Sequence, residues 1–205
     1  MLVDGTLVPF DRLVLATGSI PTLPPIRGVV RHDGSLHPRV HAFRSLADCD
    51  RLLAAVPAAR RAVVVGGGLL GLQVARALSL RGVATEVVEG AEHVLHRQVS
   101  APAGKVLARS LTRLGTTVYT GARVVRLHEH GGPEAGVGLR LDTGVVLDTD
   151  LVVLTAGGRP STALARGAGL EVRRGVVVDD HLTSPTDPRV HAIGDCAEHR
   201  GVTTG

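Results

Sequence analysis

A short β-branched run that leads into a glycine-rich turn and then into a helical pattern constrains this chain more than any other feature. The segment reads Val63-Val64-Val65-Gly66-Gly67-Gly68-Leu69-Leu70-Gly71, and Leu72 to Leu80 continue it with helical spacing. Gly66 permits a tight turn out of the strand, Gly68 leaves bare backbone for a pyrophosphate, and Gly71 lets the helix pack closely on the strand. Backbone N–H groups at the helix start, where Leu69 and Leu70 stand, would face the phosphates. The pattern predicts a strand–turn–helix unit that binds a dinucleotide.

An acidic residue at the end of the next strand supports the same interpretation. Ala84 to Val88 read as a second strand that ends in Glu89. This acid follows the glycines by about 20 residues, where a carboxylate takes the ribose 2′-hydroxyl of an adenine dinucleotide. Since it would repel a 2′-phosphate, NAD(H) is favoured over NADP(H). The alternative is a glycine-rich turn between a buried strand and a helix that binds no ligand.

Length and composition indicate a globular chain. It has 205 residues, 44% of them hydrophobic, and its core must be built from Val, Leu and Ala because aromatic residues are so few. No apolar run approaches the ~18 residues that a membrane span needs, and the N-terminus begins no signal peptide, so we expect a cytoplasmic protein without a membrane partner. The net charge of +4 is modest and stacking aromatics are almost absent, which argues against a nucleic-acid partner.

The cysteines and histidines indicate neither a disulfide framework nor a metal site. Cys49 and Cys196 are far apart and neither belongs to a C-x-x-C pair, so no active-site dithiol is expected. We interpret Cys196 as a small buried residue rather than a redox thiol. His32, His37 and His41 fit no common ligand spacing and have no evident carboxylate partner, so we expect solvated loop histidines.

Before the glycine turn, the chain reads as a hairpin and a strand followed by a linker. Met1 to Asp11 predict a hairpin about Asp4-Gly5, and Arg12 to Ala16 predict a buried strand. Prolines hold Ile20 to Gly28 extended and free of helix, and Arg31 to Val40 read as a polar loop.

A helix is expected between this linker and the central strand. Ser45-x-x-Asp48 has the spacing of a capping box, and Pro57 ends the helical pattern. The apolar stripe expected to face the core consists of Leu46, Leu52, Leu53 and Val56.

After the second strand, the pattern completes a β-α-β-α-β unit and then changes to strand periodicity. A helix is expected from about Ala103 to Leu114, and Thr116 to Tyr119 then make a third parallel strand. A meander is expected to follow, with strands Val124 to His128, Gly138 to Leu141 and Val145 to Leu147. We interpret His128 and His130 as exposed edge residues at its tip.

Two later strands end in residues that suit a ligand. Leu151 to Thr155 run into Ala156-Gly157-Gly158-Arg159-Pro160, where a glycine pair allows close approach of a ligand. The last strand, Val190 to Asp195, ends in Gly194-Asp195. Asp195 suits either of two roles, an acceptor for the hydroxyls of a polyol or an N-cap without a ligand, and the residues leave both open.

Four of these stretches are more informative as an ordered set than alone. They are Ala16-Thr17-Gly18-Ser19-x-Pro21, Gly66 to Gly71 with Glu89, Ala156 to Pro160, and Ala192-Ile193-Gly194-Asp195. In this order they resemble the two-dinucleotide-binding-domain flavoproteins of the pyridine nucleotide–disulfide oxidoreductase superfamily. The resemblance implies that the second stretch binds NAD, that Gly157 faces the nicotinamide, and that Asp195 holds the FAD ribityl chain. It implies cofactor-binding roles for the remaining motif residues Ala16, Thr17, Gly18 and Gly194, and it places Gln73 near the nicotinamide, where the family leads us to expect Glu.

Within the superfamily, the chain is most similar to the NADH-binding part of the assimilatory nitrite reductase large subunit. The similarity is carried by Gly67 to Leu72, Arg97-Gln98 and Gly194 to His199. It implies an FAD-dependent NAD(P)H oxidoreductase that passes a hydride from NADH to the flavin. The electrons would continue to an iron–sulfur or sirohaem module or to a separate acceptor protein. Cofactors carry this chemistry, so no catalytic side chain is expected.

The resemblance also implies a chain truncated at both ends, because family members carry an earlier FAD fingerprint and a later flavin-covering helix. The expected fold class is α/β, a doubly wound Rossmann-like NAD(H)-binding domain with a β-meander over residues 60–160. Partial pieces of an FAD-binding domain would flank it at 1–22 and 161–205, with a linker and connecting helix at 23–59. The absent FAD segment or a homodimer partner would complete the flavin site. The alternative is a truncated NADH-binding module without independent FAD binding or catalysis.

Overall fold

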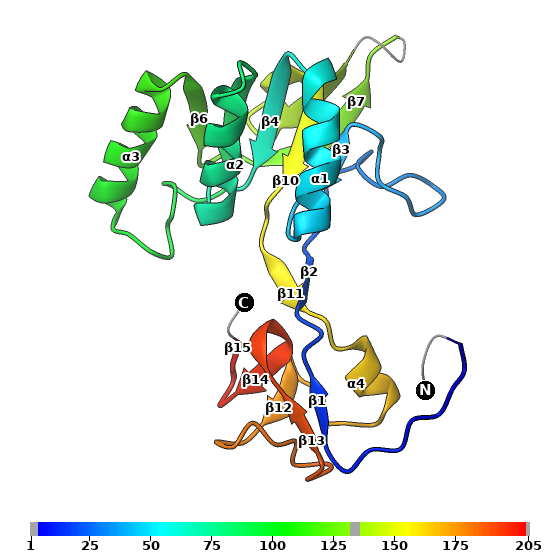
Figure 1. Cartoon of the computed structure of the whole chain (residues 1–205). Helices are drawn as coiled ribbons and strands as arrows, with labels where there is room; N and C mark the ends of the chain where they lie inside the picture. The colour runs from blue at the N-terminus through cyan, green and yellow to red at the C-terminus, as the bar shows by residue number, and fades with distance from the viewer. Residues whose placement is uncertain (1–3, 132–135, 204–205) are drawn as a thin grey trace. The chain divides into compact units, whose positions relative to one another are not determined.

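The chain folds into two compact units, which we describe separately. The computed structural model describes residues 4–131 and 136–203. The central unit comprises Pro21–Gly157, and the terminal unit comprises Met1–Ile20 together with Gly158–Gly205. The terminal unit is therefore built from both ends of the sequence, with the central unit inserted between them. Figure 1 labels most of the helices and strands of both units.

A five-stranded parallel sheet forms the framework of the central unit. Its strand order is β3-β10-β4-β5-β6, and every neighbouring pair is parallel. The strands are β3 (Val40–Ala42), β4 (Arg61–Val65), β5 (Ala84–Glu89), β6 (Thr116–Thr120) and β10 (Leu151–Leu154). β4 and β10 are almost continuously apolar and buried, as expected for strands covered on both faces.

Three helices cover one face of this sheet. They are α1 (Leu46–Ala55), α2 (Leu69–Ser79) and α3 (Ala101–Arg113), and Figure 1 shows all three on the same side. Their buried leucines Leu52, Leu78 and Leu111 share one core cluster with Val64 of β4 and Val87 of β5. The predicted strand–turn–helix unit, the second strand ending in an acid, and the following helix and third parallel strand are confirmed.

An antiparallel meander covers the other face. It consists of β7 (Val124–Glu129), β8 (Val137–Leu141) and β9 (Val146–Thr149). Leu127, Leu139 and Leu147 belong to a second core cluster that includes Val63 and Val152 of the parallel sheet. The predicted meander is confirmed, and it covers the face that crossover helices occupy in other doubly wound sheets. The loop expected over residues 131–136 lies mostly outside the described residues.

The predicted capping box at the start of α1 is present, but the predicted stripe is partly wrong. The Ser45 hydroxyl accepts a hydrogen bond from the backbone N–H of Asp48, while the Asp48 carboxylate accepts one from the backbone N–H of Ser45. Leu52 is buried, whereas Leu46 is 79% exposed and Leu53 43% exposed. Only a narrow side of α1 packs on the sheet, so helical spacing alone overestimates its apolar contact. A short 3₁₀ turn, η1 (Val56–Ala58), follows the helix.

Asp48 gives α1 a pH-dependent contribution to stability. Burial opposes its ionisation, but hydrogen bonds from the backbone N–H groups of Ser45 (2.7 Å) and Arg44 (3.0 Å) hold the pKa of Asp48 below its ordinary value. Stabilisation from a lowered carboxyl pKa is present above the unfolded pKa and is lost as the pH falls through the folded one. We expect Asp48→Asn to lower the free energy of unfolding by about 1 kcal/mol at pH 7 and to flatten its dependence on pH below about 4. Urea unfolding at pH 7 and pH 3 measures both effects, with Asp50→Asn, on an exposed residue of the same helix, as the control. Equal pH dependence in the two variants would contradict this account.

Two small sheets and one helix make up most of the terminal unit. β1 (Leu13–Leu15) pairs in parallel with β13 (Val190–Ala192), and β12 (Val176–Val178), β14 (Ala197–His199) and β15 (Val202–Thr203) form a three-stranded sheet. The other elements are β2 (Ser19–Pro21), which pairs with β11 (Gly158–Pro160), the helix α4 (Ala163–Gly167) and the 3₁₀ turn η2 (Gly194–Cys196). The core contains Leu15, Val176, Val190 and Cys196. The Cys196 side chain is fully buried, which confirms its interpretation as a small core residue.

Several expectations are wrong. The hairpin predicted about Asp4-Gly5 is not formed by residues 4–11, which contain no strand and in which Leu7 and Val8 are exposed. Its first three residues lie outside the described residues. Val14 of β1 is exposed, so this strand is only half-buried. The expected polar loop over 31–40 ends in β3, which the sequence analysis missed. His37 is buried, and its Nε2 lies 3.1 Å from Glu129 Oε1, so it is not a solvated loop residue.

Membrane-spanning helices and metal-binding clusters of side chains are both absent from the described residues. None of the described helices combines the length and apolar character that crossing a membrane requires. In the same part of the chain, no group of three or more His, Cys, Asp or Glu side chains is arranged to hold a metal ion.

Candidate dinucleotide site

Two of the three motif glycines are required by close packing at the junction of β4 and α2. Gly66 has φ +119°, and a Cβ there would lie 2.7 Å from the carbonyl oxygen of Thr155. A Cβ on Gly71 would overlap the carbonyl oxygen of Gly66 and lie 2.6 Å from Thr155 Oγ1. The turn and the close approach of helix to strand therefore have the geometry that the sequence predicts.

Gly68 differs from the other two because it faces open space. A Cβ at Gly68 would meet no atom within 4 Å, and its φ of −74° is accessible to any residue. Gly68 is the N-cap of α2, and no side chain caps this end of the helix. The first N–H groups of a helix have no partner within it, so this bare backbone can receive a phosphate. Leu69 and Leu70 lie on this first turn, and Leu69 is exposed.

The Glu89 carboxylate lies against the glycine turn. Its Oε2 accepts a hydrogen bond of 2.6 Å from the backbone N–H of Gly67, and its Oε1 accepts one of 2.8 Å from that of Ala91. Glu89 is largely buried, so these two bonds fix the orientation of the carboxylate. A carboxylate has about four acceptor positions, and two remain for the hydroxyls of a ribose.

The loop after β5 fixes the turn from its other side, which the sequence analysis missed. The backbone N–H of Leu95 donates to the carbonyl oxygen of Gly67 at 2.9 Å. His96 Nδ1 lies 3.9 Å from Glu89 Oε1. The peptide of Gly67 is thus held by Glu89 on one side and by Leu95 on the other. Arg97-Gln98 in this loop contributes to the family similarity, but it does not predict the contact of Leu95 with the turn, which is set by tertiary structure.

The turn lies at the point where the strand order of the sheet reverses. β4 has β5 on one side and β10 on the other, and ligands of such sheets bind in the crevice at the carboxyl ends of the strands. Thr155 follows β10, and its Oγ1 lies 3.1 Å from the carbonyl oxygens of Val65 and Gly66. Gly157, with φ +90° and open space around it, follows at the same sheet edge. Gln73 is exposed on α2, and no described bond joins it to Gly157.

The motif residues of the terminal unit also come together. The pairing of β1 with β13 aligns Leu15 with Ala192 and so brings Ala16, Thr17 and Gly18 close to Gly194 and Asp195. The terminal unit holds this arrangement with hydrogen bonds from Ser19 Oγ to Asp195 Oδ2 (3.0 Å) and from Thr17 Oγ1 to the Ser161 carbonyl (2.7 Å). Gly18 and Gly194 have φ values of +63° and +67°, and both face open space.

The structure excludes one of the two roles considered for Asp195. The 3₁₀ turn η2 begins after Ile193, and no side chain caps it, so the interpretation of Asp195 as an N-cap is wrong. No α-helix begins at this residue, because η2 has three residues and strand β14 follows. What the geometry provides is a carboxylate near the carboxyl end of β13, beside the Ser19 hydroxyl and two open glycines. The carboxylate can accept hydrogen bonds from the hydroxyls of a polyol chain.

A parallel sheet with a glycine turn at its switch point and an acid on the next strand defines a Rossmann-like dinucleotide-binding protein. The chain belongs to the pyridine nucleotide-disulphide oxidoreductase family, whose profile matches residues 2–204. Homologues in this family are NAD(P)H-dependent flavoprotein oxidoreductases.

Known proteins resemble the chain over nearly its whole length. It is 39% identical to the nitrite reductase [NAD(P)H] of Bacillus subtilis over 96% of this chain and 23% of the relative. A ferredoxin reductase from Rhodopseudomonas palustris is 30% identical with a TM-score of 0.85, over 96% of this chain and 46% of that one. The water-forming NADH oxidase of Lactobacillus brevis, bound to NADH, is 26% identical with a TM-score of 0.82, over 94% and 40%. The chain spans less than half the length of each of these proteins.

An engineered form of the Lactobacillus brevis enzyme adds information about the site. This NADPH oxidase, solved with NADPH, is 25% identical to the chain with a TM-score of 0.82, over 94% of this chain and 40% of that one. In this enzyme, alanine replaces a glycine and also an aspartate eighteen positions later. Gly71 and Glu89 have the same spacing in this chain.

Proposed function

We propose that the chain is the NADH-binding part of an FAD-dependent NAD(P)H oxidoreductase of the nitrite reductase large-subunit type. The observation that carries the proposal is the junction of Gly66, Gly68 and Gly71 with the Glu89 carboxylate bonded to Gly67. The exposed backbone at Gly68 would receive a diphosphate, and the oriented carboxylate of Glu89 would bind a sugar. The two lie next to each other at one edge of the sheet. The match to the family over residues 2–204 supports the same assignment.

The residues of the central unit would bind and orient the dinucleotide. The pyrophosphate would lie on Gly68 and the first turn of α2, the adenosine ribose on Glu89, and the nicotinamide near Gly157 and Gln73. The buried acid favours NADH because a 2′-phosphate would meet its negative charge. In support, the engineered relative that takes NADPH lacks an acid at the matching spacing.

The residues of the terminal unit would hold part of the flavin. Asp195 would accept hydrogen bonds from the ribityl hydroxyls, with Ala16, Thr17, Gly18 and Gly194 forming the open backbone around them. When bound, NADH supplies a hydride and FAD accepts it. The protein contributes position and exclusion of water, and no side chain is assigned a role as acid or base.

The acceptor and cellular setting are proposed from the same relatives. We assign the electrons to an iron–sulfur or sirohaem module or to a separate acceptor protein, because the relatives include a nitrite reductase and a ferredoxin reductase. The remainder of the flavin site would come from another FAD-domain segment or a homodimer partner. A cytoplasmic location fits a reductase that draws on NADH.

A titration of the purified chain with NADH and FAD tests the proposal. We expect NADH to raise the unfolding temperature and, with FAD present, to bleach the flavin absorbance under anaerobic conditions. A chain that NADH stabilises but that neither binds FAD nor reduces it is the NADH-binding module alone. A chain that does not respond to NADH would overturn the proposal.

A further inference from the structure

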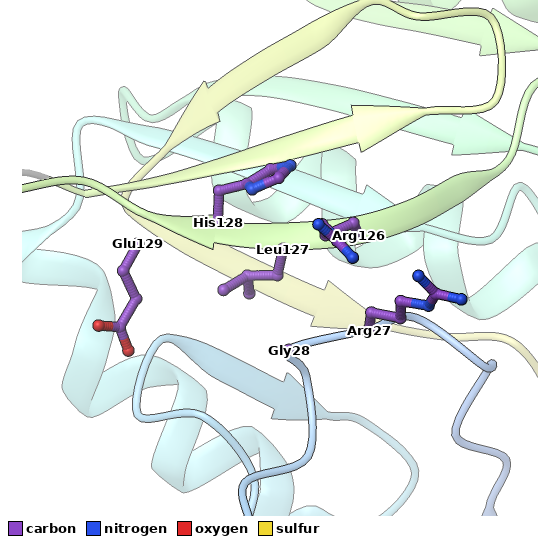
Figure 2. Close-up of a pocket in the computed structure, with 6 residues that line it drawn as sticks. All are labelled: Arg27, Gly28, Arg126, Leu127, His128 and Glu129. Carbon is purple, nitrogen blue, oxygen red and sulfur yellow. The ribbon is translucent and has the colours of Figure 1, made fainter.

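A hollow on the central unit lies apart from the residues of the dinucleotide site. Its volume is about 410 Å³, and the residues that line it are Arg27, Gly28, Arg126, Leu127, His128 and Glu129 (Figure 2). It is formed where the extended segment after the prolines runs beside β7 of the meander. No residue of the glycine turn, and neither Glu89 nor Gly157, takes part in it.

Three arginines lie side by side on neighbouring strands of the central unit, and two of them, Arg27 and Arg126, line the hollow. Arg27 is the bridge partner of Arg126, and Arg126 is the cross-strand partner of Arg140 on β8. Residues directly opposite one another project from the same face of a sheet, and all three are exposed. Figure 2 shows the side chains of Arg27 and Arg126 close together at one end of the hollow. We call these three residues the arginine row.

A glycine and two backbone hydrogen bonds bring Arg27 into the row. The Arg27 N–H donates to the Val125 carbonyl at 3.1 Å, and the Leu127 N–H donates to the Arg27 carbonyl at 2.8 Å. Gly28 has φ +86°, and a Cβ there would lie 2.6 Å from the carbonyl oxygen of Leu127. Only glycine therefore allows this segment to lie so close to β7.

In the described part of the chain, no carboxylate is bonded to the arginine row. Glu129 lines the same hollow, but its Oε1 is bonded to His37, and Figure 2 shows its side chain directed away from the two arginines. Asp148 lies on the outward side of the meander, and its Oδ1 is 3.0 Å from His130 Nε2. His128 and His130 are both half-buried, so neither is the exposed edge residue that we expected. Like charges directly opposite in a sheet are destabilising, so this surface attracts a counter-charge from outside the chain.

We propose that the arginine row is a binding site for a small anion that carries several phosphate groups. Guanidinium groups bind phosphate oxygens in pairs. Neighbouring strands lie about 4.8 Å apart, so the row extends over about 10 Å and matches a ligand with several charges along its length. Arg27 and Arg126 also line the hollow, so a ligand bound along the row would reach into it from the side of these two guanidinium groups.

Calorimetric titration with inorganic triphosphate tests the site. NADH is present at saturation, so that triphosphate cannot bind at the glycine turn. We expect binding to wild type, at least about tenfold weaker binding to Arg126→Gln and Arg140→Gln, and unchanged NADH affinity. Arg109→Gln, on an exposed arginine of α3, removes the same charge elsewhere and should bind triphosphate like wild type. If the chain does not bind NADH, the difference in triphosphate affinity between the row variants and Arg109→Gln still shows whether the arginine row binds the anion.

Three results would overturn the proposal. The first is that wild type does not bind triphosphate, and the second is that Arg109→Gln loses as much triphosphate affinity as the row variants. The third is binding of poly-glutamate but not of triphosphate, which would indicate an acidic protein partner instead.

A measurement of stability tests the arginine row without a ligand. Because it removes like-charge repulsion, Arg126→Gln should raise the urea midpoint at low salt, and the gain should vanish near 1 M salt. A midpoint that does not rise at low salt would also overturn the proposal.

Discussion

Gly71→Ala is expected to lower the free energy of unfolding by about 3 kcal/mol and to weaken NADH binding by about tenfold. The added Cβ would overlap the carbonyl oxygen of Gly66 and lie 2.6 Å from Thr155 Oγ1. Both neighbours are held, because Gly66 is in the left-handed region and Thr155 Oγ1 is hydrogen-bonded to the ends of β4. α2 must therefore move away from β4, which changes the shape of the glycine turn that would hold the diphosphate. Urea unfolding and NADH titration measure the two effects.

Gly68→Ala is the matched control for this prediction. Its Cβ would meet no atom within 4 Å, and its φ of −74° suits alanine. The entropy gained by replacing glycine opposes the loss of a favoured N-cap residue, so the stability should stay within about 1 kcal/mol of wild type. NADH binding should still fall by about tenfold or more, because the methyl group would stand where the diphosphate is proposed to lie. Wild-type NADH affinity in Gly68→Ala would place the diphosphate elsewhere, and wild-type stability in Gly71→Ala would contradict the close packing.

Sequence alone predicted the parts of this fold that local rules determine. The glycine turn requires particular backbone angles at Gly66 and close packing at Gly71, so its position between a strand and a helix could be read directly. The capping box at Ser45 and Asp48 is equally local. The meander followed from strand periodicity, since Leu127 and Leu139 alternate with outward residues on their strands.

The parts that sequence missed depend on contacts between distant segments. β3 has three residues and exists as an edge strand because β10 pairs with it. His37 is buried, and its Nε2 lies 3.1 Å from Oε1 of Glu129, a residue far along the chain. The contribution of Thr155 to the turn likewise arises only when β10 packs beside β4. Leu46 of α1 shows the opposite error, because its helical spacing places it near the core side but no neighbouring element covers it.

Glu89→Gln is expected to weaken NADH binding by about tenfold or more and to bring the affinities for NADH and NADPH close together. The carboxylate accepts from two backbone N–H groups, those of Gly67 and Ala91. An amide has one oxygen, so Gln can accept from only one of them through that atom and would direct its NH₂ at the other. The variant thus loses the orientation of the ribose acceptor together with the charge that would repel a 2′-phosphate. Parallel titrations with NADH and NADPH measure both changes.

Glu86→Gln is the matched control because it makes the same change on the same strand. Glu86 accepts a hydrogen bond of 2.9 Å from the Tyr119 hydroxyl, which an amide oxygen can replace, and it is not part of the glycine turn. We expect this variant to keep wild-type affinity for NADH and to continue to reject NADPH. If Glu89→Gln behaves in the same way, Glu89 only braces the turn through Gly67, and the preference for NADH must come from other residues. A selective loss in Glu89→Gln, with a folded chain, assigns the preference to this carboxylate.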